Sequence, residues 1–394
     1  MSRELIEANP DLRRLREEGY AVDVKDSFLL VHEIPYVNSK CQIKYGILVS
    51  DLSSMAGDQT VSPIGQHVAY FIGDHPCNSD GSEISAIKHS SQNQTFSKEI
   101  TINHSFSNKP QGGYPNYYDK MVSYINIISS QAKAIDDSVS EKPFKIVDSE
   151  NEEQIFNYVD TNSGKAKISV ISSKLSGQKV AIIGLGGTGS YILDLISKTL
   201  VQEIHLFDGD LFFQHNAFRS PGAISLEELR ALNKKTDHFQ ALYSNMRRNI
   251  FSHNYYIDNH IIDELLLMDF VFLCIDKSDI KKTIIDKLVS QGISFIDTGI
   301  GVLNIDNSLI GHIRVTTSTP DMRDHIKNRI TISDDGGNND YSNNIQIAEL
   351  NALNAALAVI KWKKLYGFYQ DQSKEFNSVY SINDGILINE DNLI

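Results

Sequence analysis

Hydrophobic and polar positions alternate in blocks along the second half of the chain. Short apolar runs at Lys179–Ile183, Glu203–Phe207 and Phe270–Ile275 have the length and composition of buried strands. Between and after them, Leu226–Ile250 and Ile280–Gln291 carry apolar residues at helical spacing. Because strands that alternate with helices form parallel sheets covered on both faces, this half predicts an α/β domain with a mostly parallel sheet and helices on both faces.

Antiparallel strands are predicted to extend this sheet. Ser294–Asp297 has the composition of one more strand. Gly301–Ile305 and Leu309–Thr316 are separated only by Asp306-Asn307-Ser308, a spacing typical of a hairpin. Asn383-Asp384-Gly385 predicts a second hairpin turn near the C-terminal end.

A long amphipathic helix is predicted over Ile345–Leu365. Apolar residues recur on one side of it at helical spacing: Ile347, Leu350, Leu353, Leu357 and Ile360. The preceding segment Ser333–Asn344, SDDGGNNDYSNN, is rich in glycine and asparagine and predicts a flexible loop.

The earlier part of the chain predicts a separate α+β domain. Asn9-Pro10 is typical of a helix start, and Gly19 suits the left-handed position that ends the helix. Three strand-like runs, then loops rich in serine, asparagine and glycine, then a helix follow: Phe28–Ile34, Ile43–Val49, His67–Ile72 and Tyr117–Ala134. The polar stretch Asp136–Gly164 predicts a linker, which gives domains of residues 1–160 and 166–394.

Composition limits the classes of protein and partner. The 394 residues carry a net charge of −13, so we expect no nucleic-acid partner and no anionic membrane partner. No apolar run approaches the ~20 residues of a membrane span, and the first residues are charged throughout, unlike a secretion signal. The cysteines Cys41, Cys77 and Cys274 form no CxxC pair, which argues against structural zinc and disulfides. Together these features predict a cytoplasmic protein.

A glycine-rich loop between a predicted strand and a predicted helix carries the first candidate chemistry. The sequence KVAIIGLGGTGSYIL supplies Gly184, Gly186, Gly187 and Gly189. Glycines let the backbone turn tightly and approach a phosphate, and the N–H groups at the following helix start point at that anion. Asp208 at the end of the next strand is placed to accept hydrogen bonds from ribose hydroxyls. We therefore expect a Rossmann-like fold that binds a nucleotide, in preference to a plain strand-to-helix turn.

The next segment, HLFDGDLFFQHNAFRSPGA, favours ATP over a nicotinamide cofactor. Cleavage between the α- and β-phosphates builds negative charge that Arg219, with Asn216 nearby, is suited to neutralise. Lys235 is a candidate second phosphate ligand, although a charged helix face that includes Lys234 is the common explanation. Asp276 follows a strand at the carboxyl edge of the sheet, where a carboxylate that faces a triphosphate suits Mg²⁺. A surface arginine and a simple helix cap are the alternatives for Arg219 and Asp276.

Several of these motifs together resemble the superfamily of ThiF, MoeB and the ubiquitin-activating enzymes. The matching pieces in chain order are GLGGTG, the D-x-D of Asp208 and Asp210, NAFR at Asn216–Arg219, Lys235, and the CID that ends at Asp276. The likeness covers about Lys179–Thr316 and the C-terminal helix.

The resemblance implies an adenylyltransferase with ATP and Mg²⁺ as cofactors. Asp208 would hold the ribose, Asp210 would take a supporting polar role, and the glycines would line the adenylate pocket. Asn216 would bind phosphate together with the groups expected to take part in catalysis: Arg219, Lys235 and the magnesium-binding Asp276. The substrate would be the C-terminal carboxylate of a ubiquitin-like protein or peptide, which attacks the α-phosphate and releases pyrophosphate.

The chain also departs from this superfamily. Ser220 stands where the usual N-L-x-R-Q pattern has glutamine, and the zinc-binding CxxC pairs of bacterial relatives are absent. No cysteine follows Cys274, whose place in a buried strand predicts core packing. We therefore expect no catalytic cysteine in this domain and direct transfer of the acyl-adenylate to the thiol of a conjugating-enzyme-like acceptor. Cys77 beside His75, in FIGDHPC, is the less favoured alternative nucleophile.

The N-terminal domain resembles an uncharacterised module that is fused to ThiF-like domains in bacterial operons encoding ubiquitin-like and conjugating proteins. YFIGDHP and FSNKPQGGYPNYYDKM carry this likeness, which implies partner or substrate recognition. Four tyrosines in the second stretch and just after it predict helix core more than a partner-binding face: Tyr114, Tyr117, Tyr118 and Tyr124.

Two further properties follow from the resemblance. Thr317–Asn344 is long for a connector, and in relatives such a crossover lies over the adenylate and guides the substrate's tail. Relatives also form homodimers in which a basic residue of one subunit completes the other's phosphate site. Lys165 and Lys167 are candidates for that residue and are equally well explained as surface charges.

Two other function classes remain open at this point. A NAD-dependent oxidoreductase is supported by the glycine loop alone. A non-catalytic scaffold that has kept the nucleotide fold as a binding module is the second alternative. No sequence feature names the substrate or the acceptor.

Overall fold

The computed structural model describes residues 2–63, 65–145, 147, 155–158, 160–166, 168–276, 278–330 and 345–392. The chain forms two compact units, Met1–Ser172 and Ser173–Ile394. The predicted loop Ser333–Asn344 lies outside the described residues, as does Lys167. None of the helices in the described ranges combines the length and apolar character that a membrane crossing requires.

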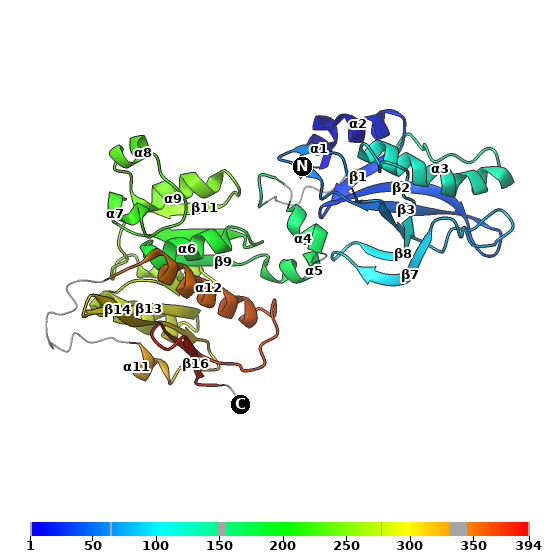
Figure 1. Ribbon diagram of the computed structural model, residues 1–394. Helices are drawn as coiled ribbons and strands as arrows, with labels where there is room; N and C mark the ends of the chain where they lie inside the picture. The colour runs from blue at the N-terminus through cyan, green and yellow to red at the C-terminus, as the bar shows by residue number, and fades with distance from the viewer. Residues whose placement is uncertain are drawn as a thin grey trace. The chain divides into compact units, whose positions relative to one another are not determined.

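The N-terminal unit is built on an antiparallel six-stranded sheet of order β1-β2-β3-β6-β8-β7. Its elements, several of them labelled in Figure 1, are α1 Ser2–Ala8, α2 Pro10–Glu17, β1 Ala21–Lys25, β2 Phe28–Val37, β3 Ile43–Asp51, β4 Met55–Ala56, β5 Gln59–Thr60, β6 Val68–Ile72, β7 Lys88–Thr95, β8 Thr101–Ser107, α3 Tyr117–Ile135, α4 Thr161–Ala166 and α5 Ser169–Ser172.

Helix α3 packs its apolar face on this sheet. The buried core there combines α3 with residues of α1, α2, β1, β2, β3 and β6, and it includes all four tyrosines of the cluster at 114–124. The expectation that these tyrosines form core is confirmed. Lys120 lies in the same interface with no exposed surface, and its Nζ donates to Oγ of Ser50 at 2.8 Å.

Two features of this unit differ from the prediction. The region between β6 and residue 115 was expected to be loop, yet it contains β7 and β8. The sequence of β7, KHSSQNQT, lacks apolar residues, because this edge strand is held by backbone pairing to β8 and faces water. Helix α2 begins after Asn9 as expected, but the Asn9 side chain makes no cap bond. Its Nδ2 donates instead to the carbonyls of Leu5 and Asp58.

The second unit contains an eight-stranded sheet of order β11-β10-β9-β12-β13-β14-β15-β16. Its elements are the 3₁₀ helix η1 Ser173–Leu175, β9 Lys179–Ile183, α6 Gly187–Ile196, β10 Glu203–Phe207, α7 Gln214–Ala217, α8 Leu226–Arg230, α9 Lys235–Ser244, β11 Ile250–His253, the 3₁₀ helix η2 Ile262–Leu267, β12 Phe270–Leu273, α10 Ser278–Ser290, β13 Ser294–Ile305, β14 Ser308–Ser318, α11 Ile326–Arg329, α12 Ala348–Leu365, β15 Asn377–Ser381 and β16 Ile386–Glu390.

The predicted Rossmann-like architecture is confirmed. Strands β11, β10, β9, β12 and β13 run parallel, and β14, β15 and β16 are added antiparallel. Since β9 pairs with both β10 and β12, the strand order reverses at β9 and β12, which defines the switch point where ligands bind in such sheets. Both predicted hairpins are present, and Asp306 and Asn307 take the positive φ values, 51° and 61°, of a tight turn.

Helices cover both faces of the parallel sheet. One core joins side chains of α6, α9 and α12 to alternate residues of β9, β10 and β12, and Figure 1 shows α6 and α12 over the sheet. The opposite core joins η2, α10 and α11 to the intervening residues of the same strands. The alternation of burial along each strand thus places its side chains in two separate cores.

Two helical predictions in this unit are partly wrong. Leu226–Ile250 is not one helix but α8 and α9, and Ile250 begins β11. Helix α12 is present, but Leu353 and Ile360 are 36% and 43% exposed. Its most deeply buried residues are small or polar as well as aromatic: Asn351, Asn354, Ala355, Ala358 and Trp362. Small side chains let α12 approach α6 closely, so the apolar stripe does not mark the packed face.

Candidate nucleotide site

The glycine loop joins β9 to α6 at the switch point. Gly184 leaves the strand with φ of +89°, a conformation that favours glycine. Its N–H donates to the carbonyl of Phe207 at 2.8 Å. A Cβ atom at Gly189 would overlap the carbonyl oxygen of Gly184. The absence of side chains at these two positions therefore lets the helix start directly against the end of the strand.

Gly186, immediately before α6, faces open space. The nearest atom to a Cβ placed there would be Oε1 of Gln346, 4.0 Å away. That oxygen is buried and has no hydrogen-bond partner among the described residues. The first N–H groups of an α-helix have no partner within the helix and form the positive end of its dipole. The loop therefore leaves room for an anion at the start of α6.

Gly187 has a different neighbour from Gly186. A Cβ atom at Gly187 would overlap the Asn351 side chain of α12. Oδ1 of Asn351 accepts a hydrogen bond from Oγ1 of Thr188 at 3.1 Å, and its Nδ2 lies 3.5 Å from the carbonyl oxygen of Arg219. Asn351 therefore connects the glycine loop to the segment that bears Arg219.

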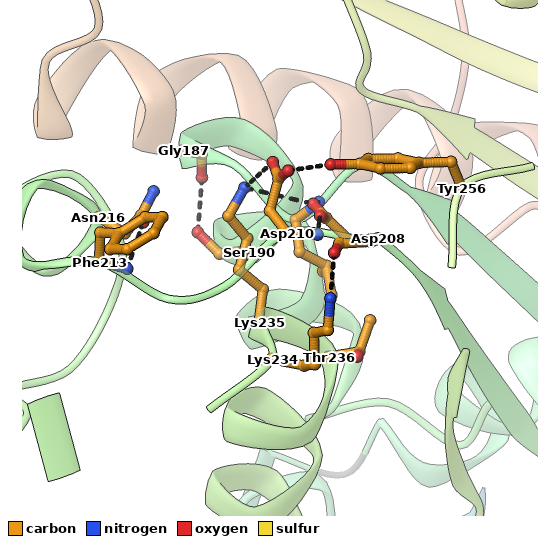
Figure 2. Close-up of polar contacts among 12 residues, drawn as sticks. Gly187, Ser190, Asp208, Asp210, Phe213, Asn216, Lys234, Lys235, Thr236 and Tyr256 are labelled. Carbon is orange, nitrogen blue, oxygen red and sulfur yellow. Dashed lines mark hydrogen bonds and ion pairs between the residues drawn. The ribbon is translucent and has the colours of Figure 1, made fainter. Parts of the chain in front are cut away.

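Asp208 follows β10 and is held beside the glycine loop (Figure 2). It is 6% exposed, and its Oδ2 accepts the N–H of Leu185 at 2.7 Å. Its Oδ1 accepts the N–H of Asp210 at 2.8 Å. These bonds fix the carboxylate at the carboxyl end of its strand, where ribose-binding acids of such sheets lie.

Lys235 begins α9 and points into the same cluster. Its Nζ lies 2.7 Å from Oδ2 of Asp210 and 3.6 Å from Oδ2 of Asp208. Figure 2 draws both contacts as dashed lines. Only 6% of Lys235 is exposed, so the alternative interpretation as a solvated helix face is wrong. Tyr256 donates to the other oxygen of Asp210.

Asn216 and Arg219 lie on α7 and the turn after it. Oδ1 of Asn216 accepts the N–H of Phe213 at 2.8 Å, whereas its Nδ2 is buried without an acceptor among the described residues. Nε of Arg219 is buried and has none there either. Ser220 donates to the carbonyl of Asn216 at 2.8 Å and so closes this turn. Buried donors of this kind fit a phosphate, which accepts several charge-assisted hydrogen bonds.

The charged groups gather on one side of the sheet edge. Burial lowers the pKa of Arg219, and the negative charge of Asp276 opposes that shift. Burial lowers the pKa of His215 as well, and the nearby charges of Arg219 and Lys235 lower it further. The charge of Asp276 thus acts on Arg219, and the charges of Arg219 and Lys235 act on His215.

Asp276 is the magnesium ligand that the sequence predicts. It is exposed just beyond the carboxyl end of β12. Within the described ranges no group of three histidine, cysteine, aspartate or glutamate side chains is arranged to hold a metal ion. Magnesium bound with a nucleotide needs only one or two carboxylates, because phosphate oxygens and waters supply its other ligands.

Several residues of this region were not predicted, among them Asn351 on α12. His215 adjoins Asn216 in QHNAFR, so its neighbourhood was visible in the sequence. Tyr256 lies 46 positions from its partner Asp210, and Gln346 lies between the loop Ser333–Asn344 and α12. No local pattern signals contacts at such separations.

Cys77 and Cys274 have the surroundings of structural residues, whereas Cys41 is exposed. Burial raises the pKa of the Cys274 thiol to about 12. Cys77 is 1% exposed, burial also raises its pKa, and its Sγ donates to the backbone carbonyl of His75. The ring of His75 instead bonds the carbonyl of Pro76 at 2.9 Å. His75 is therefore not arranged as a base for Cys77.

Residues 163–306 match the ThiF family, and residues 10–161 match a domain of unknown function, DUF6791. The chain thus has a ThiF family domain preceded by a DUF6791 domain. The ThiF match supports a nucleotide-binding enzyme of the adenylyltransferase type. No curated protein matches the chain.

Several solved structures are similar to part of this chain at low identity. PaaA is 19% identical with a TM-score of 0.44 over 57% of this chain and 75% of that chain. E. coli MccB solved with ATP is 17% identical with a TM-score of 0.42 over 56% and 66%. Another structure of E. coli MccB is 14% identical with a TM-score of 0.43 over 70% and 84%. These likenesses concern the fold alone.

Proposed function

We propose that the second unit uses ATP and Mg²⁺ to adenylylate the C-terminal carboxylate of a ubiquitin-like protein or peptide. The observation that carries the proposal is a pair of buried donors, Nδ2 of Asn216 and Nε of Arg219, for which the described ranges contain no acceptor. Lys235 adds a second buried cation. Such a set of donors matches the charge of a triphosphate, whereas hydride transfer from a nicotinamide requires none of it.

In the proposed reaction a carboxylate oxygen forms a bond to the α-phosphorus. The bond from that phosphorus to the oxygen bridging to the β-phosphate breaks, and its electron pair leaves with pyrophosphate. Negative charge therefore builds on the leaving phosphates, where Arg219 and Lys235 stabilise it. Asn216 donates to a phosphate oxygen, and Asp208 accepts from the ribose.

Asp276 would hold the magnesium ion that accompanies ATP. The ion supplies charge neutralisation and a fixed orientation for the phosphates. Asp276 is also the acid whose field reaches Arg219, so it helps to keep that guanidinium at the phosphate side of the site.

The proposed product is an acyl-adenylate that passes directly to the thiol of a conjugating-enzyme-like acceptor. Support comes from the raised pKa values of Cys77 and Cys274, since a thiol held in its neutral form is a poor nucleophile. Incubation of the chain with ATP and its substrate should give no adduct that resists denaturation and is cleaved by thiols. Detection of such an adduct would overturn this part of the proposal.

Further parts of the proposal concern partners and location. We propose that the DUF6791 domain recognises the substrate or the acceptor, and that the protein is a cytoplasmic homodimer. Lys165, exposed on α4, is a candidate to complete the phosphate site of a second subunit. Sedimentation of the full chain tests the dimer, and a Lys165→Ala variant should then lower turnover without dissociating it.

The decisive experiment is ATP–pyrophosphate exchange. Purified chain is incubated with ATP, Mg²⁺, labelled pyrophosphate and a ubiquitin-like protein from a neighbouring gene. Label should enter ATP only when the substrate is present with a free C-terminal carboxylate. The matched control is the same substrate with an amidated C-terminus, which should abolish exchange.

Two outcomes would replace the proposal with its alternatives. Binding of NADH in preference to ATP, measured by quenching of nicotinamide fluorescence, would favour an oxidoreductase. A nucleotide-binding scaffold would be favoured by two results together. The parent protein would catalyse no ATP–pyrophosphate exchange, and the Arg219→Ala variant would keep every function that is measured.

A further inference from the structure

Tyr256 contacts the nucleotide site from the segment after β11. Its hydroxyl donates to Oδ1 of Asp210, and Figure 2 shows the side chain directed at that carboxylate. Its ring covers Gly209, where an added Cβ would lie 2.7 Å from a ring carbon. Tyr256 thus contacts the short link between Asp208 and Asp210 through both its ring and its hydroxyl.

Asp210 also contacts Lys235. Its second oxygen, Oδ2, accepts from Nζ of Lys235 at 2.7 Å. Nζ also lies 3.6 Å from Asp208, which is itself bonded to the N–H of Leu185 in the glycine loop. The four side chains and the loop therefore form one continuous line of polar contacts from Tyr256 to the expected phosphate position.

We propose that Tyr256 is a positioning residue, which acts through Asp210 to hold the Lys235 ammonium in its binding geometry. Asp210 is exposed, and Lys235 and Tyr256 donate to different oxygens of its carboxylate. With donors on both oxygens its orientation is defined, and Lys235 has a fixed partner. The inference rests on the proposed role of Lys235 as a phosphate ligand.

The chemistry of the tyrosine suits this role. The hydrogen bond to Asp210 raises the pKa of Tyr256 to about 12. The phenol therefore stays protonated near neutral pH and remains a donor throughout the range in which the enzyme would work.

The chain offers a matched control in the adjacent residue. The hydroxyl of Tyr255 bonds to Glu264 at 2.7 Å and contacts His253 at 2.8 Å, away from Asp210. Tyr256→Phe and Tyr255→Phe each remove one phenolic oxygen from the same segment. The dissociation constant of Mg·ATP, measured by calorimetry, should rise about three- to tenfold for Tyr256→Phe, the effect of one hydrogen bond of typical net strength. It should change less than about twofold for Tyr255→Phe.

A double-mutant cycle with Asp210→Asn separates positioning from a general structural effect. If Tyr256 acts through the Asp210 carboxylate, Tyr256→Phe should add little to the loss already caused by Asp210→Asn. A full additional loss in that background would overturn the proposal, as would equal dissociation constants for Tyr256→Phe and the parent. The binding assay needs no carboxylate substrate. A parent that binds ATP without exchanging pyrophosphate would overturn the proposed reaction and leave the positioning role standing.

Discussion

Gly189 lies directly against the carbonyl oxygen of Gly184, so closely that a Cβ atom at residue 189 would overlap it. Gly186, in the same loop, has no atom nearer than 4.0 Å to its own hypothetical Cβ. The loop therefore contains glycines for two physical reasons. Gly189 permits backbone to pack on backbone, whereas Gly186 keeps the start of α6 open.

This difference predicts opposite phenotypes for two alanine variants. Gly189→Ala should destabilise the second unit by about 2 kcal/mol or more, because the overlapped atom is backbone and has no rotamer to change. Gly186→Ala should unfold like the parent but bind Mg·ATP at least about tenfold more weakly, since its methyl group occupies the space for phosphate. Fluorescence of Trp362, buried in the core of this unit, measures unfolding, and calorimetry measures binding. Equal ATP affinity for Gly186→Ala and the parent would place the phosphates elsewhere.

Arg219 should be required for turnover rather than for folding. Arg219→Ala should lower ATP–pyrophosphate exchange by about 100-fold, the usual loss for one preorganised group that stabilises developing charge. Arg219→Lys should recover only part of the rate, because an ammonium lacks the forked donors of a guanidinium. The control is Arg230→Ala, an exposed arginine on α8, which should exchange at the parental rate. A parental rate for Arg219→Ala would remove the residue from the mechanism.

Asp276 should set the magnesium requirement. Asp276→Asn should raise the magnesium concentration for half-maximal exchange at saturating ATP, because an amide is a weaker ligand than a carboxylate for this ion. Asp286→Asn, which removes one exposed carboxylate from α10 nearby in the sequence, is the matched control for net charge. If both variants shift the magnesium curve equally, the effect is long-range electrostatics and Asp276 is not a ligand.

Lys120 should give the N-terminal unit a distinctive dependence on pH. Burial lowers the pKa of Lys120 to about 8, against 10.5 for the unperturbed group. Between about pH 8 and pH 10.5 the unfolded chain binds more protons than the folded chain. The free energy of unfolding should therefore rise with pH in this window. Relative to a Lys120→Met variant, the parent should gain about 1.5 kcal/mol between pH 8 and 9.5. Below about pH 7, where Lys120 is protonated in both states, the difference between the two should be constant.

The measurement must separate the two units. Hydrogen exchange of amides in α3 reports the N-terminal unit, while Trp362 reports the second. The variant should change α3 protection without moving the Trp362 transition. A flat difference curve across pH 8 to 9.5 would mean that Lys120 is not held neutral by burial.

Much of the second unit follows from local patterns. The apolar runs at β9, β10 and β12 are strands because each is buried on both faces, and the turn at Asp306 and Asn307 is encoded by residues that tolerate positive φ. The pattern of apolar residues gave wrong predictions for elements that are not held by burial of large apolar side chains. The strand β7 is polar because it is an exposed edge, and α12 packs through small and amide side chains that carry no apolar signal.

The sequence by itself determined the alternation of strands and helices, the glycine loop, and the residue types that a phosphate site needs, because these depend on spacing within a few turns of chain. Only the tertiary structure decided that Lys235 is buried against Asp210 and that Tyr256 reaches the same carboxylate. It also decided that Asn216 and Arg219 hold buried donors with no acceptor in the part of the chain that the structure describes. Those properties depend on which distant segments meet at the switch point and exclude water there, and no local spacing along the chain contains that information.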